Sequence, residues 1–149
     1  MTKFLVIFDV DSTLIEDEVI ELLAECAGKR VEVAEVTERA MRGELDFAQS
    51  LRERVAKLEG LPASVIEQTY DRIRVTKGAA ELIEAIHAKG GKAAAVSGGF
   101  SQLLEPLADR LNLDFWRANI LEIKDGALTG KVDGEIVDRE AKAQALKSW

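Results

Sequence analysis

The chain has 149 residues, a formal net charge of −7 at pH 7 and 47% hydrophobic residues, which suffices for one domain with a hydrophobic core. The acidic balance argues against a nucleic-acid surface and an anionic membrane partner, because both require clustered Lys and Arg. The only cysteine, Cys26, excludes an internal disulfide and favours a reducing compartment. The N-terminal apolar run is too short for a signal peptide or a membrane span, so we expect a cytoplasmic protein.

The first predicted element is a strand that ends in two carboxylates. Five consecutive apolar residues, 4–8, lead directly into Asp9 and Asp11. Such a short apolar run is typical of a strand buried on both faces of a parallel sheet. Positions i and i+2 of an extended chain project from the same face, so the two carboxylates are expected to point to one place. Their repulsion calls for a cation or a proton; a solvated, Asp-rich turn is the alternative.

Four helical segments are predicted after this strand. Apolar residues recur every three or four positions over 16–27, 31–41, 47–58 and 63–73. Gly28 closes the first segment, and Asp46 is a good N-cap for the third. No strand pattern interrupts these segments, so we expect a small helical bundle inserted directly after the first strand.

The second half of the chain alternates helices and strands, which indicates an α/β core. The pattern predicts helices over 78–89 and 100–111, strands over 92–96 and 115–122, a hairpin joining 120–124 to 127–132, and a last helix from 138. Asp125-Gly126 is the turn signal of the hairpin. A right-handed crossover places the first two strands side by side, so Asp9 and Ser97 are expected at neighbouring strand ends.

The residues at these strand ends suit phosphoryl transfer. Asp9 can accept a phosphoryl group, while Asp11 can protonate the departing alkoxide and deprotonate the attacking water. Ser97 and the amide of Gly98, between a strand and a helix, can bind an anion, although the same glycine pair also suits an ordinary tight turn. Lys142 by itself has the character of a surface lysine.

Several stretches resemble the motifs of one enzyme family. DVDST at 9–13, VSGGF at 96–100 and the lysine of VDREAKAQAL at 137–146 resemble, in this order, the first three motifs of the haloacid dehalogenase-like phosphohydrolases. MRGELDFAQSLRERV at 41–55 and ILEIKDGALTG at 120–130 are similar to the branch of that family that hydrolyses phosphoserine. The resemblance extends over the whole chain.

The resemblance implies a fold and a reaction. The fold is a Rossmann-like core over 1–14 and 75–149, with a four-helix cap over 15–74. The reaction is Mg²⁺-dependent hydrolysis of a small-molecule substrate, phosphoserine, through an aspartyl-phosphate, which is the last step of serine biosynthesis.

The resemblance also assigns roles to the motif residues. Asp9 is the nucleophile and a metal ligand. Asp11 is the acid–base group and gives its backbone carbonyl to the metal. Ser97, the amide of Gly98 and Lys142 hold the phosphate.

In the expected cap, the resemblance places Glu18 against the substrate ammonium group and Arg54 against its carboxylate, with Met41 and Phe47 closing over it. An amino-acid head group requires one anion and one cation, and Arg suits bidentate binding of a carboxylate. Apart from the resemblance, the two charged residues are typical of solvated helix faces and the two apolar ones of a bundle core. His87 needs no functional role.

One family motif is absent from the sequence. Neither KDGA at 124–127 nor VDGE at 132–135 fits the fourth motif, an acidic loop that follows a further strand. We therefore expect a truncated core whose metal site lacks one oxygen ligand and whose first strand is an exposed apolar edge that promotes self-association. Two alternatives stay open: a non-catalytic fragment that binds phosphate or phosphoserine, and hydrolysis or phosphoryl transfer on another small phosphorylated metabolite.

Overall fold

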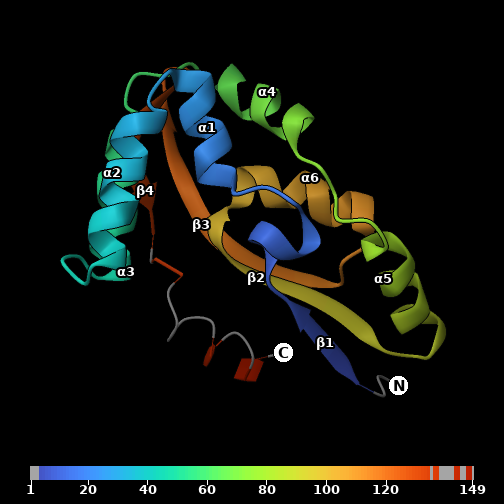
Figure 1. Cartoon of the computed structure of the whole chain (residues 1–149). Helices are drawn as coiled ribbons and strands as arrows, with labels where there is room; N and C mark the ends of the chain where they lie inside the picture. Colours follow the sequence, from blue (N-terminus) through green and yellow to red (C-terminus); the bar gives the residue numbers. More distant parts are fainter. Residues whose placement is uncertain (1–3, 135, 138–142, 145–146, 149) are drawn as a thin grey trace.

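The computed structural model describes residues 4–134, 136–137, 143–144 and 147–148. In this part of the chain four strands form one sheet, in the order β1 (Leu5–Phe8), β2 (Lys92–Phe100), β3 (Phe115–Lys124) and β4 (Ala127–Asp133). β1, β2 and β3 are parallel, and β4 runs antiparallel to β3 (Figure 1). The predicted α/β class and the pairing of the first two strands are confirmed.

β1 forms one edge of the sheet within the described residues. It pairs with β2, and all four of its residues are half-buried. Val6 and Phe8 pack against the main hydrophobic cluster, and Ile7 packs against a second cluster of Val96 and Val137. Both faces of the strand are therefore covered, as predicted, while the edge without a neighbouring strand leaves its residues only half-buried. The expected apolar edge is present.

Four helices follow β1, as the sequence predicts: α1 (Val19–Ala27), α2 (Arg30–Met41), α3 (Phe47–Ala56) and α4 (Ser64–Arg72). Gly28 ends α1 in the left-handed conformation, with φ +69°. Asp46 starts α3 with a capping box, in which its carboxylate accepts a hydrogen bond from the Gln49 amide at 2.8 Å. Figure 1 shows α1 close to the carboxyl end of β2, and α2 and α3 side by side next to β4.

A wide turn over Val10–Leu14 separates β1 from the helices. The amide of Ile15 closes this turn by donating to the carbonyl of Val10 at 3.1 Å. Ile15 then forms an antiparallel bridge with Val75. This arrangement explains why α1 begins at Val19 and not at residue 16, where the helical spacing of apolar residues starts.

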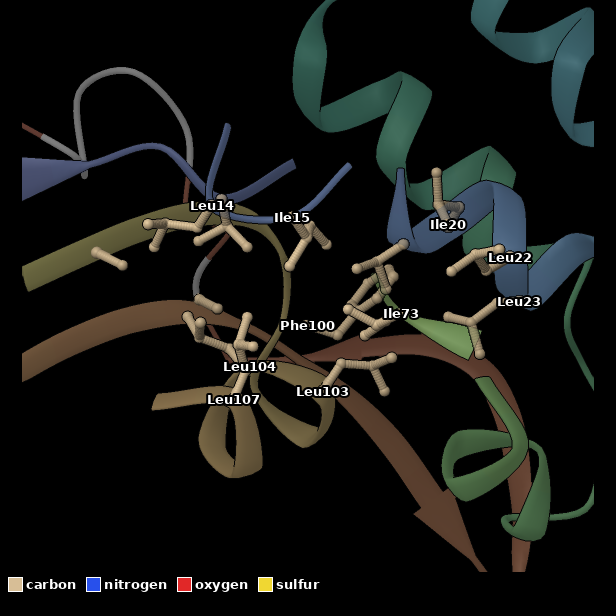
Figure 2. Packing of buried hydrophobic residues seen from close by; sticks show 14 of the residues in the cluster. Leu14, Ile15, Ile20, Leu22, Leu23, Ile73, Phe100, Leu103, Leu104 and Leu107 are labelled. Atoms are coloured by element: carbon tan, nitrogen blue, oxygen red, sulfur yellow. The ribbon is translucent and has the colours of Figure 1, made fainter. Parts of the chain in front are cut away.

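The hydrophobic core fastens this turn to the rest of the sheet. Helices α5 (Ala79–Ala88) and α6 (Ser101–Leu111) flank β2 along the chain. Leu14, Ile15, Phe100, Leu103 and Leu107 are each at most 2% exposed, and Figure 2 shows them gathered between the turn and α6. Burial of such a side chain contributes about 1.5–3 kcal/mol, so these contacts stabilise the position of the segment that carries Asp9 and Asp11.

The β3–β4 hairpin is tied to the loop between α3 and α4. Its turn has the predicted residues, Asp125 and Gly126, both at positive φ. Leu128 exchanges hydrogen bonds of 2.8 Å with the loop, accepting from the Gly60 amide and donating to the Leu61 carbonyl. Backbone from the helical insert therefore covers the outer edge of β4 at Ala127 and Leu128.

Two predicted boundaries differ from the structure or fall outside it. β2 continues to Phe100 and does not end at Val96, because it rejoins the ladder after an irregularity. The predicted last helix, with its start at Asp138, and Lys142 lie outside the described residues. In the described part of the chain, no helix has the length and apolar character needed to cross a membrane.

Candidate active site

The two carboxylates at the end of β1 are held by nearby backbone amides. Both Asp9 and Asp11 have extended backbone angles, as the prediction of a common direction requires. Asp9 accepts a hydrogen bond from the Val10 amide at 3.2 Å. Asp11 accepts one from the Val19 amide at 3.4 Å, at the start of α1. The first helix of the insert thus contacts the second carboxylate directly.

Asp11 has a strongly shifted acidity. Burial of the carboxyl raises its pKa from an ordinary value of 3.8 to about 7, and the negative charges of Glu18 and Asp9 act in the same direction. The hydrogen bond from the Val19 amide opposes the shift without cancelling it. A carboxyl group that is close to half-protonated at neutral pH is suited to donate and accept protons in turn.

The Ser97-Gly98-Gly99 segment forms a bulge beside these carboxylates. Ser97 is 3% exposed, and its hydroxyl oxygen accepts a hydrogen bond from the Gly99 amide at 2.8 Å. A Cβ atom built on Gly99 would lie 3.1 Å from Ser97 Oγ and 3.9 Å from Asp11 Oδ2. The structure therefore brings together the first two sequence motifs, as predicted.

Phe47 reaches from α3 to this bulge. A Cβ atom built on Gly98 would lie 2.9 Å from Cζ of the Phe47 ring, so the glycine makes room for the ring. The ring itself is 42% exposed. Of the predicted apolar cap residues, Phe47 therefore lies at the site, whereas Met41 lies at the end of α2 with 84% of its surface exposed.

Glu18 and Arg54 lie in the electrostatic field of the same site. The Ser12 hydroxyl donates to Glu18 Oε1 at 2.8 Å. Burial lowers the pKa of Arg54, and the negative charges of Glu18 and Asp11 oppose that change, which places the guanidinium near both acids. Arg54 also donates to the Ser50 carbonyl at 3.3 Å. The expected pair of one anion and one cation is present beside Asp11.

The metal ligands expected here are the Asp9 carboxylate and the Asp11 backbone carbonyl. Within the described residues, no group of three or more His, Cys, Asp or Glu side chains comes together in a way that could hold a metal ion. The two expected ligands are nevertheless hard oxygen donors, and Mg²⁺ commonly combines few protein oxygens with several waters. The donor chemistry therefore fits Mg²⁺ with a small set of protein ligands.

The hydrogen-bond partners of Asn119 and of His87 were not predicted from the sequence. Asn119, on β3, is 1% exposed and donates to the Gly98 carbonyl at 2.9 Å. The sequence feature that could have indicated this role is a single amide residue among the apolar positions of a strand.

His87 Nε2 lies 2.7 Å from Asp114 Oδ2, beside a hollow of about 700 Å³ at the amino ends of β2 and β3. This hollow is at the far end of the strands from Asp9.

Cys26 is only half-buried and has polar neighbours. Thr69 Oγ1 and Arg72 Nη1 each lie 3.7 Å from its sulfur. These contacts join α1 to α4 on the side of the insert.

Comparison with known proteins points to one family. Residues 6–149 match the haloacid dehalogenase-like hydrolases. The chain is 55% identical over 147 residues to the phosphoserine phosphatase of Streptococcus thermophilus, covering 99% of this chain and 68% of that protein. It is 57% identical over 145 residues to the phosphoserine phosphatase of Streptomyces coelicolor, covering 97% of this chain but only 35% of that protein.

Solved structures agree with the sequence comparison. A phospho-aspartyl intermediate analogue of phosphoserine phosphatase superposes with a TM-score of 0.91 at 42% identity, covering 99% of this chain and 71% of that one. A substrate-bound phosphoserine phosphatase superposes with a TM-score of 0.90 at 41% identity, covering 99% of this chain and 70% of that one.

Proposed function

The chain belongs to the haloacid dehalogenase-like hydrolase family, and from this premise we propose that it hydrolyses O-phosphoserine to serine and phosphate. The observation that carries the proposal is the Asp11 carboxyl, with a pKa of about 7, beside Asp9 and the Ser97 bulge. The names of the relatives and of the superposed structures support the choice of substrate. Because the chain spans 68% of the S. thermophilus protein, the activity of that whole protein is a proposal for this chain.

Two carboxyl groups divide the chemistry. Asp9 attacks phosphorus with a carboxylate oxygen, and the bond between phosphorus and the serine oxygen breaks. Asp11 gives its proton to the departing serine oxygen. Asp11 then takes a proton from water as the water oxygen bonds to phosphorus and the Asp9–phosphorus bond breaks. Phosphate leaves, and both carboxyl groups return to their initial states.

The neighbouring groups bind and orient the substrate. We propose that the phosphate oxygens are bound by the Ser97 hydroxyl, the Gly98 amide and Lys142. Hydrogen-bond donors and a positive charge stabilise the negative charge of these oxygens. Asp9 and the Asp11 carbonyl are the proposed Mg²⁺ ligands; the bound ion would neutralise charge on the phosphate.

The residues of the helical insert are proposed to give specificity. Glu18 faces the substrate ammonium group and Arg54 its carboxylate, while Met41 and Phe47 cover the substrate. Residues 15–74 are then a cap and residues 1–14 with 75–149 the core. The bridge between Ile15 and Val75 supports this division, because it joins the two points where the chain enters and leaves the insert.

The test of the reaction is release of phosphate from phosphoserine in the presence of Mg²⁺. The chain is compared with its Asp9→Asn variant, which keeps the shape of the side chain and removes the nucleophile. Release by the parent and none by the variant supports the aspartyl mechanism. Binding of phosphoserine without release by the parent would favour the second candidate, a binding fragment without catalysis.

The test of the cap residues compares two esters. Glu18→Ala and Arg54→Ala are expected to raise KM for phosphoserine at least ~10-fold, since each removes a charged partner, with little change in KM for p-nitrophenyl phosphate, which lacks the amino-acid group. Arg52→Ala is the control, because Arg52 lies on α3 like Arg54 and is exposed. Equal effects on the two esters would contradict the cap assignment and favour another phosphorylated metabolite.

The edge of the sheet supports a proposal about assembly. Among the described residues no strand pairs with the outer side of Leu5–Phe8, so its N–H and C=O groups can pair with a second copy of the chain, and we expect self-association through β1. Sedimentation at micromolar concentration tests this, and a single monomeric species would contradict it. The cytoplasmic location expected from the single cysteine and the short N-terminal apolar run stays a prediction.

A further inference from the structure

The phosphate-binding segment proposed above lies outside the regular hydrogen bonding of the sheet. β2 pairs with β3 at Val96 and Arg117 and again at Phe100 and Asn119. Three residues of β2, Ser97 to Gly99, therefore lie opposite the single residue Ala118 of β3. A bulge of this kind removes ladder partners from the backbone groups within it, and those groups need other partners.

Asn119 supplies one of these partners from the adjacent strand. Its side chain is 1% exposed, and Nδ2 donates to the Gly98 carbonyl at 2.9 Å. Oδ1 accepts from the Val137 amide at 2.6 Å. A carbonyl requires the NH₂ end of the amide and an N–H requires the oxygen end, so the orientation of the Asn119 side chain is determined by its two partners.

The peptide that Asn119 holds is also the one that orients Ser97. The carbonyl of Gly98 and the amide of Gly99 belong to one planar peptide unit. On the opposite side of that unit, the Gly99 amide donates a hydrogen bond of 2.8 Å to Ser97 Oγ. A rotation of this peptide would therefore move the serine oxygen as well. Ser97 Oγ accepts this bond, and a hydroxyl that accepts can also donate its own hydrogen, here to a phosphate oxygen.

We infer that Asn119 is a positioning residue for the phosphate site: its amide fixes the Gly98–Gly99 peptide and links it to the Val137 segment. One buried side chain therefore joins the bulge of β2 to the backbone at Val137. Packing alone does not call for an amide here, since a leucine would fill a similar volume without buried polar atoms. The inference rests on the proposed function.

Two substitutions in the 149-residue chain separate the two hydrogen bonds. Asn119→Asp keeps an acceptor for the Val137 amide and, when its carboxyl is ionised, offers no donor to the Gly98 carbonyl, so this variant is assayed at about pH 9. Asn119→Leu removes both hydrogen bonds. We expect kcat/KM to fall about 10-fold in the first variant and about 100-fold in the second, because small displacements of phosphate ligands carry costs of this order. The loss should be equal for phosphoserine and p-nitrophenyl phosphate, since both carry the same phosphate group.

A second readout is the affinity for inorganic phosphate, followed by amide chemical shifts in a titration. It should fall in parallel with kcat/KM in Asn119→Asp. Ile83→Val, a buried change in α5, is the control: it should lower Tm and leave kcat/KM and phosphate affinity unchanged. If Asn119→Leu fails to fold, Asn119→Asp carries the test alone.

The outcomes separate this inference from the proposed function. Kinetics and phosphate affinity within twofold of the parent in Asn119→Asp would overturn the inference. If the parent hydrolyses neither ester, the proposed function fails, and the phosphate titration alone decides about Asn119. Weaker phosphate binding by Asn119→Asp than by the parent then supports the inference; equal binding, or no binding by the parent, overturns it.

Discussion

Asp11→Asn is expected to stabilise the folded chain while it abolishes phosphate release. The folded-state pKa of Asp11 is raised from 3.8 to about 7, so the folded chain keeps a proton that the unfolded chain loses between these two values. The contribution of Asp11 to stability is therefore fully present below about pH 3.8 and is lost as the pH rises to about 7. Since one pH unit corresponds to about 1.36 kcal/mol, ionised Asp11 costs about 4 kcal/mol above that range.

Asparagine has the shape of the neutral acid and can still accept from the Val19 amide, so it avoids this cost. We expect Asp11→Asn to raise the free energy of unfolding by about 2 kcal/mol at pH 5 and about 4 kcal/mol at pH 8. The measurement is urea unfolding followed by tryptophan fluorescence, at both pH values and with a chelator present. Asp109→Asn, an exposed change on α6, is the control.

A gain in stability that is the same at pH 5 and pH 8, or no gain at either, would refute the reasoning. In the first case the change would act through packing; in the second the carboxyl would be solvated. A pH-dependent gain together with loss of phosphate release would show that Asp11 is needed for catalysis although its ionised form lowers the free energy of unfolding.

Three smaller changes test other parts of the structure. Asp46→Ala removes the cap of α3 and is expected to lower the free energy of unfolding by about 1 kcal/mol in urea; an unchanged midpoint would contradict the capping role. Gly98→Ala puts a methyl group against the Phe47 ring and should raise KM for phosphoserine several-fold, and adding Phe47→Ala should remove that sensitivity to the methyl group. Gly126→Ala places a side chain at φ +74° and should lower Tm by a few degrees, which thermal unfolding measures.

The features that the sequence predicted correctly have local causes. An apolar run before Asp9, a glycine after α1, an N-cap before α3 and the Asp125-Gly126 turn each act within a few residues of where they occur. Their effects do not depend on the remainder of the chain, so the elements and the order of the first two motifs were predictable.

The features that were missed depend on contacts between distant segments. The pKa of Asp11 depends on its burial and on Glu18, and the partner of Asn119 lies on another strand. The end of β2 was placed too early because the Ser97-Gly98-Gly99 sequence suits a turn as well as a bulge. Only the neighbouring strand β3, to which β2 returns at Phe100, distinguishes the two.

The covered edge of β4 determines the symmetry of any assembly through the sheet. The α3–α4 loop occupies the outer side of β4 at Leu128, so within the described residues β1 offers the open edge. An interface formed by the same strand from two copies is isologous, with a two-fold axis between them. In the part of the chain that the structure describes, such a pair uses the open edge of both copies, so association through β1 is expected to close at a dimer.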